Sequence, residues 1–79
     1  MTDRLEDLAA DEQVERMKHI AEVLSRIIKE RGGRMSLKES RDAAARALNT
    51  TVDEVDYGVV YGESTHALTV PGGGVYITA

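Results

Sequence analysis

Few residues of this chain have the types and spacing that catalysis or metal binding requires. Ser64 and His66 are two positions apart and would point the same way along a strand, but no identifiable orienting carboxylate or oxyanion donor accompanies them. With no cysteine and only His19 as a second histidine, the chain offers no disulfide and no cluster at zinc-ligand spacing. We therefore expect a protein without enzymatic activity, cofactor or structural metal.

Charged residues divide the chain into three segments. Residues 1–25 carry three cations against seven carboxylates, residues 26–46 carry seven cations against three, and residues 47–79 carry four carboxylates and no cation. The basic middle is a candidate surface for phosphate groups, with a solvated helical face as the alternative interpretation. The side chains that would contact phosphates are Arg34, Lys38, Arg41 and Arg46.

The length of 79 residues predicts one domain with a small core. A domain of this size buries only about 60% of the surface that its unfolded chain exposes. Self-association is a common way for such a domain to gain stability. No apolar run approaches the roughly 20 residues of a membrane span, and the acidic start is unlike a signal peptide. We expect a cytoplasmic protein without a membrane partner, in which an acidic segment, 1–13, that could be helical precedes a domain over 14–79.

Apolar periodicity predicts a first helix from about Val14 to Arg31, ended by two glycines. Its apolar residues span an arc of about 180°, wider than the ~100° stripe of an ordinary surface helix. The additional arc could pack on the N-terminal segment through Leu5, Leu8 and Ala9, or on a second copy of the chain. The residues that would serve self-association are Ile20, Val23 and Ile27.

Capping patterns predict where the following helices begin. After a short strand at Arg34 and Met35, the pair Ser36 and Glu39 forms a capping box that opens a second helix. Asn49 is suited to a left-handed cap at its end. Immediately afterwards, Thr51 with Glu54 or Thr50 with Asp53 forms the next capping box, so the sequence predicts a tight turn between two helices.

Residues 55–61 are compatible with either a helix or a strand. Val55, Tyr57, Val59 and Tyr61 alternate with other residues as in a strand, and Gly58 costs a helix about 1 kcal/mol relative to alanine. A strand here would give two helices against a three-stranded antiparallel meander. The cap at Thr51, the valines 52, 55 and 59 on one helical face, and Gly62 at the position of a C-cap favour a third helix.

The run from Ala45 to Val55 resembles the core of a helix-turn-helix motif, with alanine in the first helix and leucine before the turn. Residues 67–70 and 75–78, around the loop 71–74, are similar to the wing of a winged-helix protein. The order of elements over 14–79 thus resembles the winged-helix superfamily. The resemblance implies a small α+β fold of three helices with a C-terminal β-hairpin, and a function in DNA binding or, in some members, protein interaction.

Base reading is disfavoured on the exposed side of the predicted third helix, because direct readout of DNA relies mainly on arginine, lysine, asparagine and glutamine. Paired tyrosines among carboxylates suit a protein partner better, although they could instead pack beneath the wing. The candidate partner-binding residues are Asp53, Glu54, Tyr57 and Tyr61.

The sequence therefore predicts a non-enzymatic regulatory or adaptor module that binds a protein partner and self-associates through its first helix as a homodimer. The alternative is a DNA-binding transcriptional regulator that contacts phosphates through residues 26–46. Because the chain has a formal net charge of −4, DNA binding of that kind would be weak and strongly dependent on salt.

Overall fold

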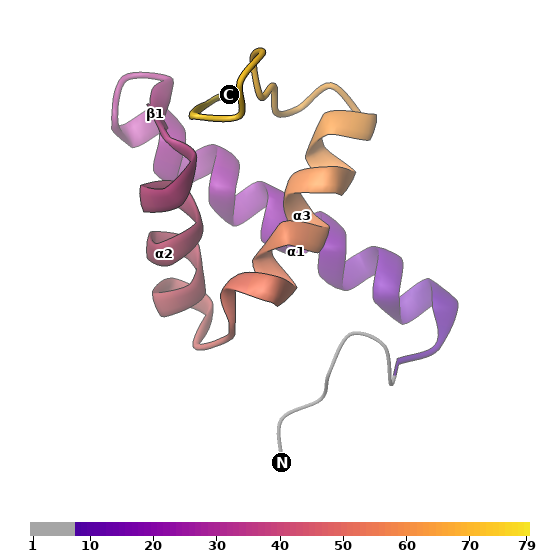
Figure 1. Ribbon diagram of the computed structural model, residues 1–79. Coiled ribbons are helices and arrows are strands. Elements are labelled where there is room, and N and C mark those ends of the chain that lie inside the picture. The colour runs from indigo at the N-terminus through magenta and orange to yellow at the C-terminus, as the bar shows by residue number, and fades with distance from the viewer. Residues whose placement is uncertain (1–7) are drawn as a thin grey trace.

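The computed structural model describes residues 8–79, which form a small α+β domain of three helices and a two-stranded antiparallel sheet (Figure 1). In chain order the elements are α1 (Ala10–Glu30), β1 (Arg34–Ser36), α2 (Leu37–Leu48), α3 (Val52–Ser64) and β2 (Tyr76–Thr78). Helix α1 lies behind α2 and α3, and the C-terminal segment returns to β1. The predicted contact of Leu5 lies outside the described residues.

One hydrophobic cluster holds the elements together. Leu24 and Ile28 of α1 are fully buried at its centre, with Val55 of α3 and Ile77 of β2. All three helices and both strands thus contribute to a single core, as expected for one domain of this size. The remaining buried members of the cluster are Ile20, Ala21, Met35, Ala44, Ala45, Val59 and Leu68.

Helix α1 begins at Ala10, four residues before the predicted start at Val14. Its first turn contains Asp11 and Glu12, whose carboxylates interact favourably with the positive end of the helix dipole. After Glu30 the backbone turns through Gly32 and Gly33, at φ of 91° and 89°, where glycine avoids the strain of a side chain. Among residues 8–79 no helix combines the length and apolarity needed to cross a membrane.

The predicted caps of α2 and α3 are confirmed. The backbone N–H of Glu39 donates to Ser36 Oγ at 3.4 Å, and that of Glu54 donates to Thr51 Oγ1 at 3.2 Å. Asn49 ends α2 in the left-handed conformation, with φ of 53° and ψ of 50°. The two helices are therefore joined by a short turn whose geometry is set by local hydrogen bonds.

Residues 52–64 are helical, so the alternative of two helices with a three-stranded meander is wrong. In the sequence Gly58 disfavours a helix, because glycine is a weak helix former. In the structure this glycine faces α1. A Cβ atom there would overlap the Ile20 side chain and lie 3.2 Å from the backbone nitrogen of Ala21. Gly62 likewise faces the Leu68 side chain and lies within the helix, which continues to Ser64, so its predicted role as a C-cap is wrong.

The C-terminal strand pairs differently from the predicted hairpin. β2 forms its ladder with β1, where Met35 is opposite Ile77, and meets the preceding segment only in a bridge between Thr69 and Thr78. The backbone oxygen of Val75 instead accepts a hydrogen bond from the backbone N–H of Leu37, the first residue of α2. The side chain of Val75 is exposed, with a residue exposure of 61%. Val75 therefore does not share the inward face of Leu68 and Ile77, which are both buried.

Replacing Gly58 with alanine should destabilise the protein, although alanine favours a helix by about 1 kcal/mol. Overpacking against Ile20 should outweigh that gain and lower the free energy of unfolding by about 1–3 kcal/mol. Urea unfolding followed by circular dichroism measures the difference. Gly72→Ala is the control, because a Cβ atom there meets nothing within 4 Å. Equal stability of wild type and Gly58→Ala would contradict the proposed steric role of this glycine.

Candidate functional site

The outward side of α3 presents hydrophobic side chains beside a carboxylate. Tyr57 is 44% exposed and Val60 is 64% exposed, three positions apart, so they are neighbours on the helix. Asp53 is exposed one turn before Tyr57. We refer to Asp53, Tyr57 and Val60 as the α3 surface. Sequence analysis missed Val60 as a site residue, although its spacing from Tyr57 on a helix places the two side chains together.

Two of the predicted partner-binding residues face α1 instead. Glu54 is half-buried, with Oε2 3.7 Å from Nε of Arg16. Tyr61 is half-buried and packs against the hydrophobic core. The four predicted residues are therefore divided between the solvent side of α3 and its contact with α1, because successive residues of a helix are rotated by about 100°.

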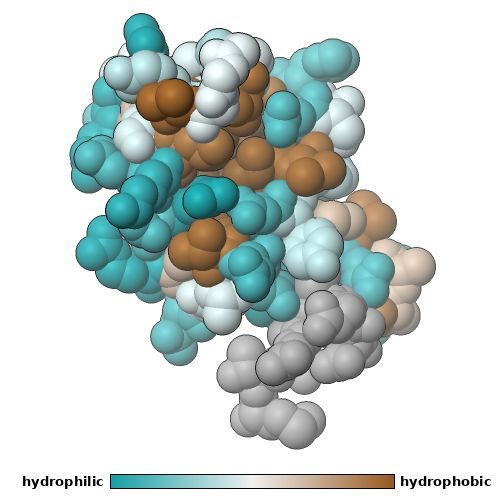
Figure 2. Space-filling view, in the orientation of Figure 1, coloured by the Kyte–Doolittle hydropathy of each residue, from teal (hydrophilic) through white to brown (hydrophobic). Residues whose placement is uncertain are grey.

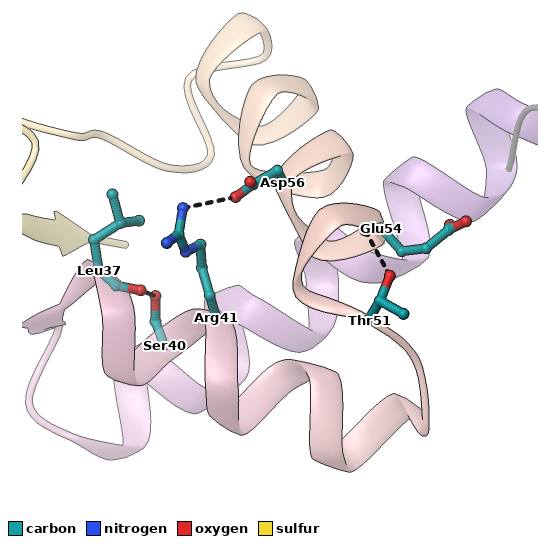
Figure 3. Close-up of polar contacts among 6 residues, drawn as sticks. All are labelled: Leu37, Ser40, Arg41, Thr51, Glu54 and Asp56. Carbon is teal, nitrogen blue, oxygen red and sulfur yellow. Dashed lines mark hydrogen bonds and ion pairs between the residues drawn. The ribbon is translucent and has the colours of Figure 1, made fainter. Parts of the chain in front are cut away.

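Arg41, one of the predicted phosphate contacts, is already paired. Its Nη1 lies 3.2 Å from Oδ1 of Asp56, which joins α2 to α3 across the turn (Figure 3). The same view shows the buried Ser40 hydroxyl donating to the backbone oxygen of Leu37 at 2.7 Å. Arg41 therefore supports the arrangement of the helices and has less of its charge available to a phosphate.

The predicted phosphate contacts do not all lie on one side of α2, although Lys38 is three positions before Arg41. The Arg34 guanidinium lies 4.1 Å from the centre of the Tyr76 ring, in a cation–π contact between β1 and β2. Lys38 and Arg46 are exposed at opposite ends of α2. Since Arg46 follows Arg41 by five positions, the two side chains are about 140° apart around the helix.

The predicted self-association residues are mostly inside the chain. Ile20 is 2% exposed and Val23 is 5% exposed, while Ile27 is half-buried against the core. The backbone of α3 comes close to Ile20 because the α3 residue that faces Ile20 is Gly58, which has no side chain. In this fold Ile20 and Val23 are therefore not available to a second copy, and the apolar arc of α1 is covered by the domain from Ile20 onward, whereas Val14 stays exposed.

A groove that sequence analysis did not predict runs along α1 beside the end of α3, with a volume of about 670 Å³. Ala21, Tyr61 and Ala67 provide uncharged lining, and charged side chains of α1 follow at intervals of three and four residues. This spacing, which keeps residues on one side of a helix, was visible in the sequence but indicated no groove without the position of α3. The other lining residues are Lys18, Glu22, Ser25, Arg26, Lys29, Glu30 and Thr65.

Ser64 and His66 do not follow one strand, as the nucleophile hypothesis required. Ser64 is the last residue of α3, and its hydroxyl donates to the backbone oxygen of Tyr61 at 2.8 Å. His66 is exposed in the following turn with φ of 65°. Within residues 8–79, no group of three histidine or acidic side chains is arranged to hold a metal ion.

Hydrophobic side chains reach the surface in several places over α2, α3 and the C-terminal segment, separated by hydrophilic ones (Figure 2). Away from α3, the exposed large hydrophobic residues within 8–79 are Val14, Val75 and Tyr76. Among these positions only Tyr57 and Val60 share one exposed helical face, so the α3 surface is the candidate functional site.

A double-mutant cycle should detect the contact between Arg41 and Asp56. Both side chains are more than 30% exposed, so solvent screening should limit their coupling to about 0.2–1 kcal/mol. Arg41→Gln, Asp56→Asn and the double variant, compared by urea unfolding, supply the cycle. Lys38→Gln is a control for loss of a cation from α2. Additive effects of the two substitutions would show that the pair contributes nothing to stability.

Comparisons with protein-family models, curated proteins and solved structures found no match to this chain. The geometry and charge of the described surfaces favour the hydrophobic and acidic α3 surface over the dispersed cations of β1 and α2 as the place where a partner would bind.

Proposed function

We propose that this chain is a non-enzymatic regulatory or adaptor module of winged-helix type that binds a protein partner through the α3 surface. The observation that carries the proposal is the exposure of Tyr57 and Val60 together on α3, beside Asp53. A tyrosine with a neighbouring aliphatic side chain supplies the apolar contact area typical of protein interfaces. The fitting partner has an exposed hydrophobic residue flanked by lysine or arginine.

The order of elements supports the winged-helix part of this proposal. A short turn with Asn49 in the left-handed conformation joins α2 to α3, as in a helix-turn-helix. β1 lies between α1 and α2 in sequence and pairs with β2. The bridge between Thr69 and Thr78 encloses the loop 71–74, which would correspond to a short wing.

Charge favours a protein partner over DNA. The helix in the recognition position, α3, contains four carboxylates and no lysine or arginine. Carboxylates repel phosphates, and their base contacts are confined largely to cytosine. The loop 71–74 contributes a proline and three glycines, so it brings no cation to a groove either. The exposed cations Lys38 and Arg46 remain as the basis of the alternative, a DNA-binding regulator that contacts phosphates.

An amide NMR titration with mixed-sequence duplex DNA separates these functions. For a protein-binding module we expect residues 52–64 to keep their chemical shifts at both low and physiological salt. Shifts confined to residues 34–46 that fade with salt would indicate phosphate contacts by the basic segment. Shifts in α3 that persist at physiological salt would overturn the proposal.

Removing the hydrophobic groups of the α3 surface should abolish partner binding without unfolding the protein. Tyr57→Ser with Val60→Ser is compared with wild type by affinity capture from the source cells and quantitative mass spectrometry. Val75→Ser is the matched control, because Val75 is 61% exposed and lies outside α3, whereas Val60 is 64% exposed. We expect the double variant to lose at least tenfold of a partner that the control retains. Unchanged capture by a folded double variant would contradict the proposed surface.

A further inference from the structure

We propose that two copies of this chain pair through antiparallel α1 helices, so that the N-terminal half of each α1 lies along the groove of the other copy. This interface is distinct from the α3 surface and uses the outer side of α1, opposite the buried Ile20. It replaces the self-association through Ile20, Val23 and Ile27 that the sequence had predicted.

The outer side of α1 carries opposite charges in its two halves. Six exposed residues recur at intervals of three and four, so they share one side of the helix. The first two are acidic, the last two are basic, and the middle two have one charge of each sign. In order they are Asp11, Glu15, Lys18, Glu22, Arg26 and Lys29.

A single antiparallel register satisfies these charges. With the two-fold axis at residue 20, Asp11 of one copy is opposite Lys29 of the second, and Lys18 is opposite Glu22. The same register brings Glu15 beside Arg26, one residue from its opposite position. Since a two-fold interface repeats each contact, every favourable pair occurs twice.

The helix dipole explains only part of this charge pattern. A dipole favours carboxylates in the first turn and cations in the last, which accounts for Asp11, Glu12 and Lys29. Glu15 and Arg26 lie beyond those turns, where the effect has decayed. On the same helix Lys18 lies three positions from Glu15 and Glu22 lies four positions from Arg26, and the antiparallel pairing gives Glu15 and Arg26 each a further opposite charge.

An exposed hydrophobic residue fits the same arrangement. Val14 is 45% exposed and lies seven and eleven positions before Ala21 and Ser25, which line the groove, so it is on the groove side of α1. In the antiparallel register Val14 is opposite Arg26 of the second copy and can enter that copy's groove towards Tyr61. The first turns of α1 extend beyond α2 and α3 (Figure 1), and Asp11, Val14 and Glu15 are exposed there.

Charge-reversal variants test the pairing, because each variant should dimerise weakly alone and normally when mixed with the other. One variant carries Asp11→Lys and Glu15→Lys, and the other carries Arg26→Glu and Lys29→Glu. Each homodimer then opposes like charges, whereas the mixed dimer has complementary charges at both ends. Sedimentation equilibrium at about 0.1 M salt should show at least a tenfold weaker dimer for each variant alone and recovery of the wild-type dissociation constant in the mixture.

Two controls separate pairing from folding and from net charge. Circular dichroism verifies that each variant is folded, and a helix weakened by an altered dipole would not recover on mixing. Lys38→Glu with Arg46→Glu, on α2, changes the net charge as much as Arg26→Glu with Lys29→Glu and should leave the dimer intact. A monomeric wild type at millimolar concentration, or a mixture no stronger than its components, would overturn the proposal. The double variant Tyr57→Ser with Val60→Ser should still dimerise, so a failure of the proposed α3 partner site can be distinguished from a failure of the α1 dimer.

Discussion

The close approach of α1 and α3 at Gly58 is the contact on which the other features of this domain depend. Without a side chain at Gly58, the backbone of α3 can lie against Ile20 and Ala21. This approach covers the middle of the apolar side of α1, at Ile20 and Ala21, and fixes the orientation of α3. It therefore decides that Tyr57 and Val60 face solvent, while Tyr61 lines the groove beside α1.

Charged residues serve different purposes on the three helices. The pair of Arg41 and Asp56 connects α2 with α3, and Arg16 of α1 lies near Glu54 of α3. These contacts use cations and carboxylates that composition alone would assign to free surface. On the outer side of α1, by contrast, the described structure leaves the charges exposed. A net charge or a count of cations therefore says little about which surface can bind an anion, because pairing within the fold removes some of them.

Local features of the fold could be predicted from the sequence, and long-range ones could not. The caps at Ser36 and Thr51 and the left-handed Asn49 depend on neighbouring residues, so their patterns identified the helix starts and the turn. The pairing of Met35 with Ile77 depends on residues far apart in the chain, and the sequence indicated a hairpin instead. Helical periodicity placed Ile20 and Val23 on the apolar side of the first helix but could not indicate which neighbours cover them. From the sequence Gly58 is only a weak helix former, because its close contact with α1 exists only in the folded domain.

The short sheet also has a consequence for the order of folding. β1 and β2 are separated by both α2 and α3, yet the fully buried Ile77 belongs to β2 and completes the core. Pairing residues this distant requires closure of a long loop, whose entropic cost falls once the intervening helices are formed and packed. The helices can thus form early from local contacts, and we expect insertion of Ile77 to be a late step. Until that step, one side of the hydrophobic core remains open to solvent.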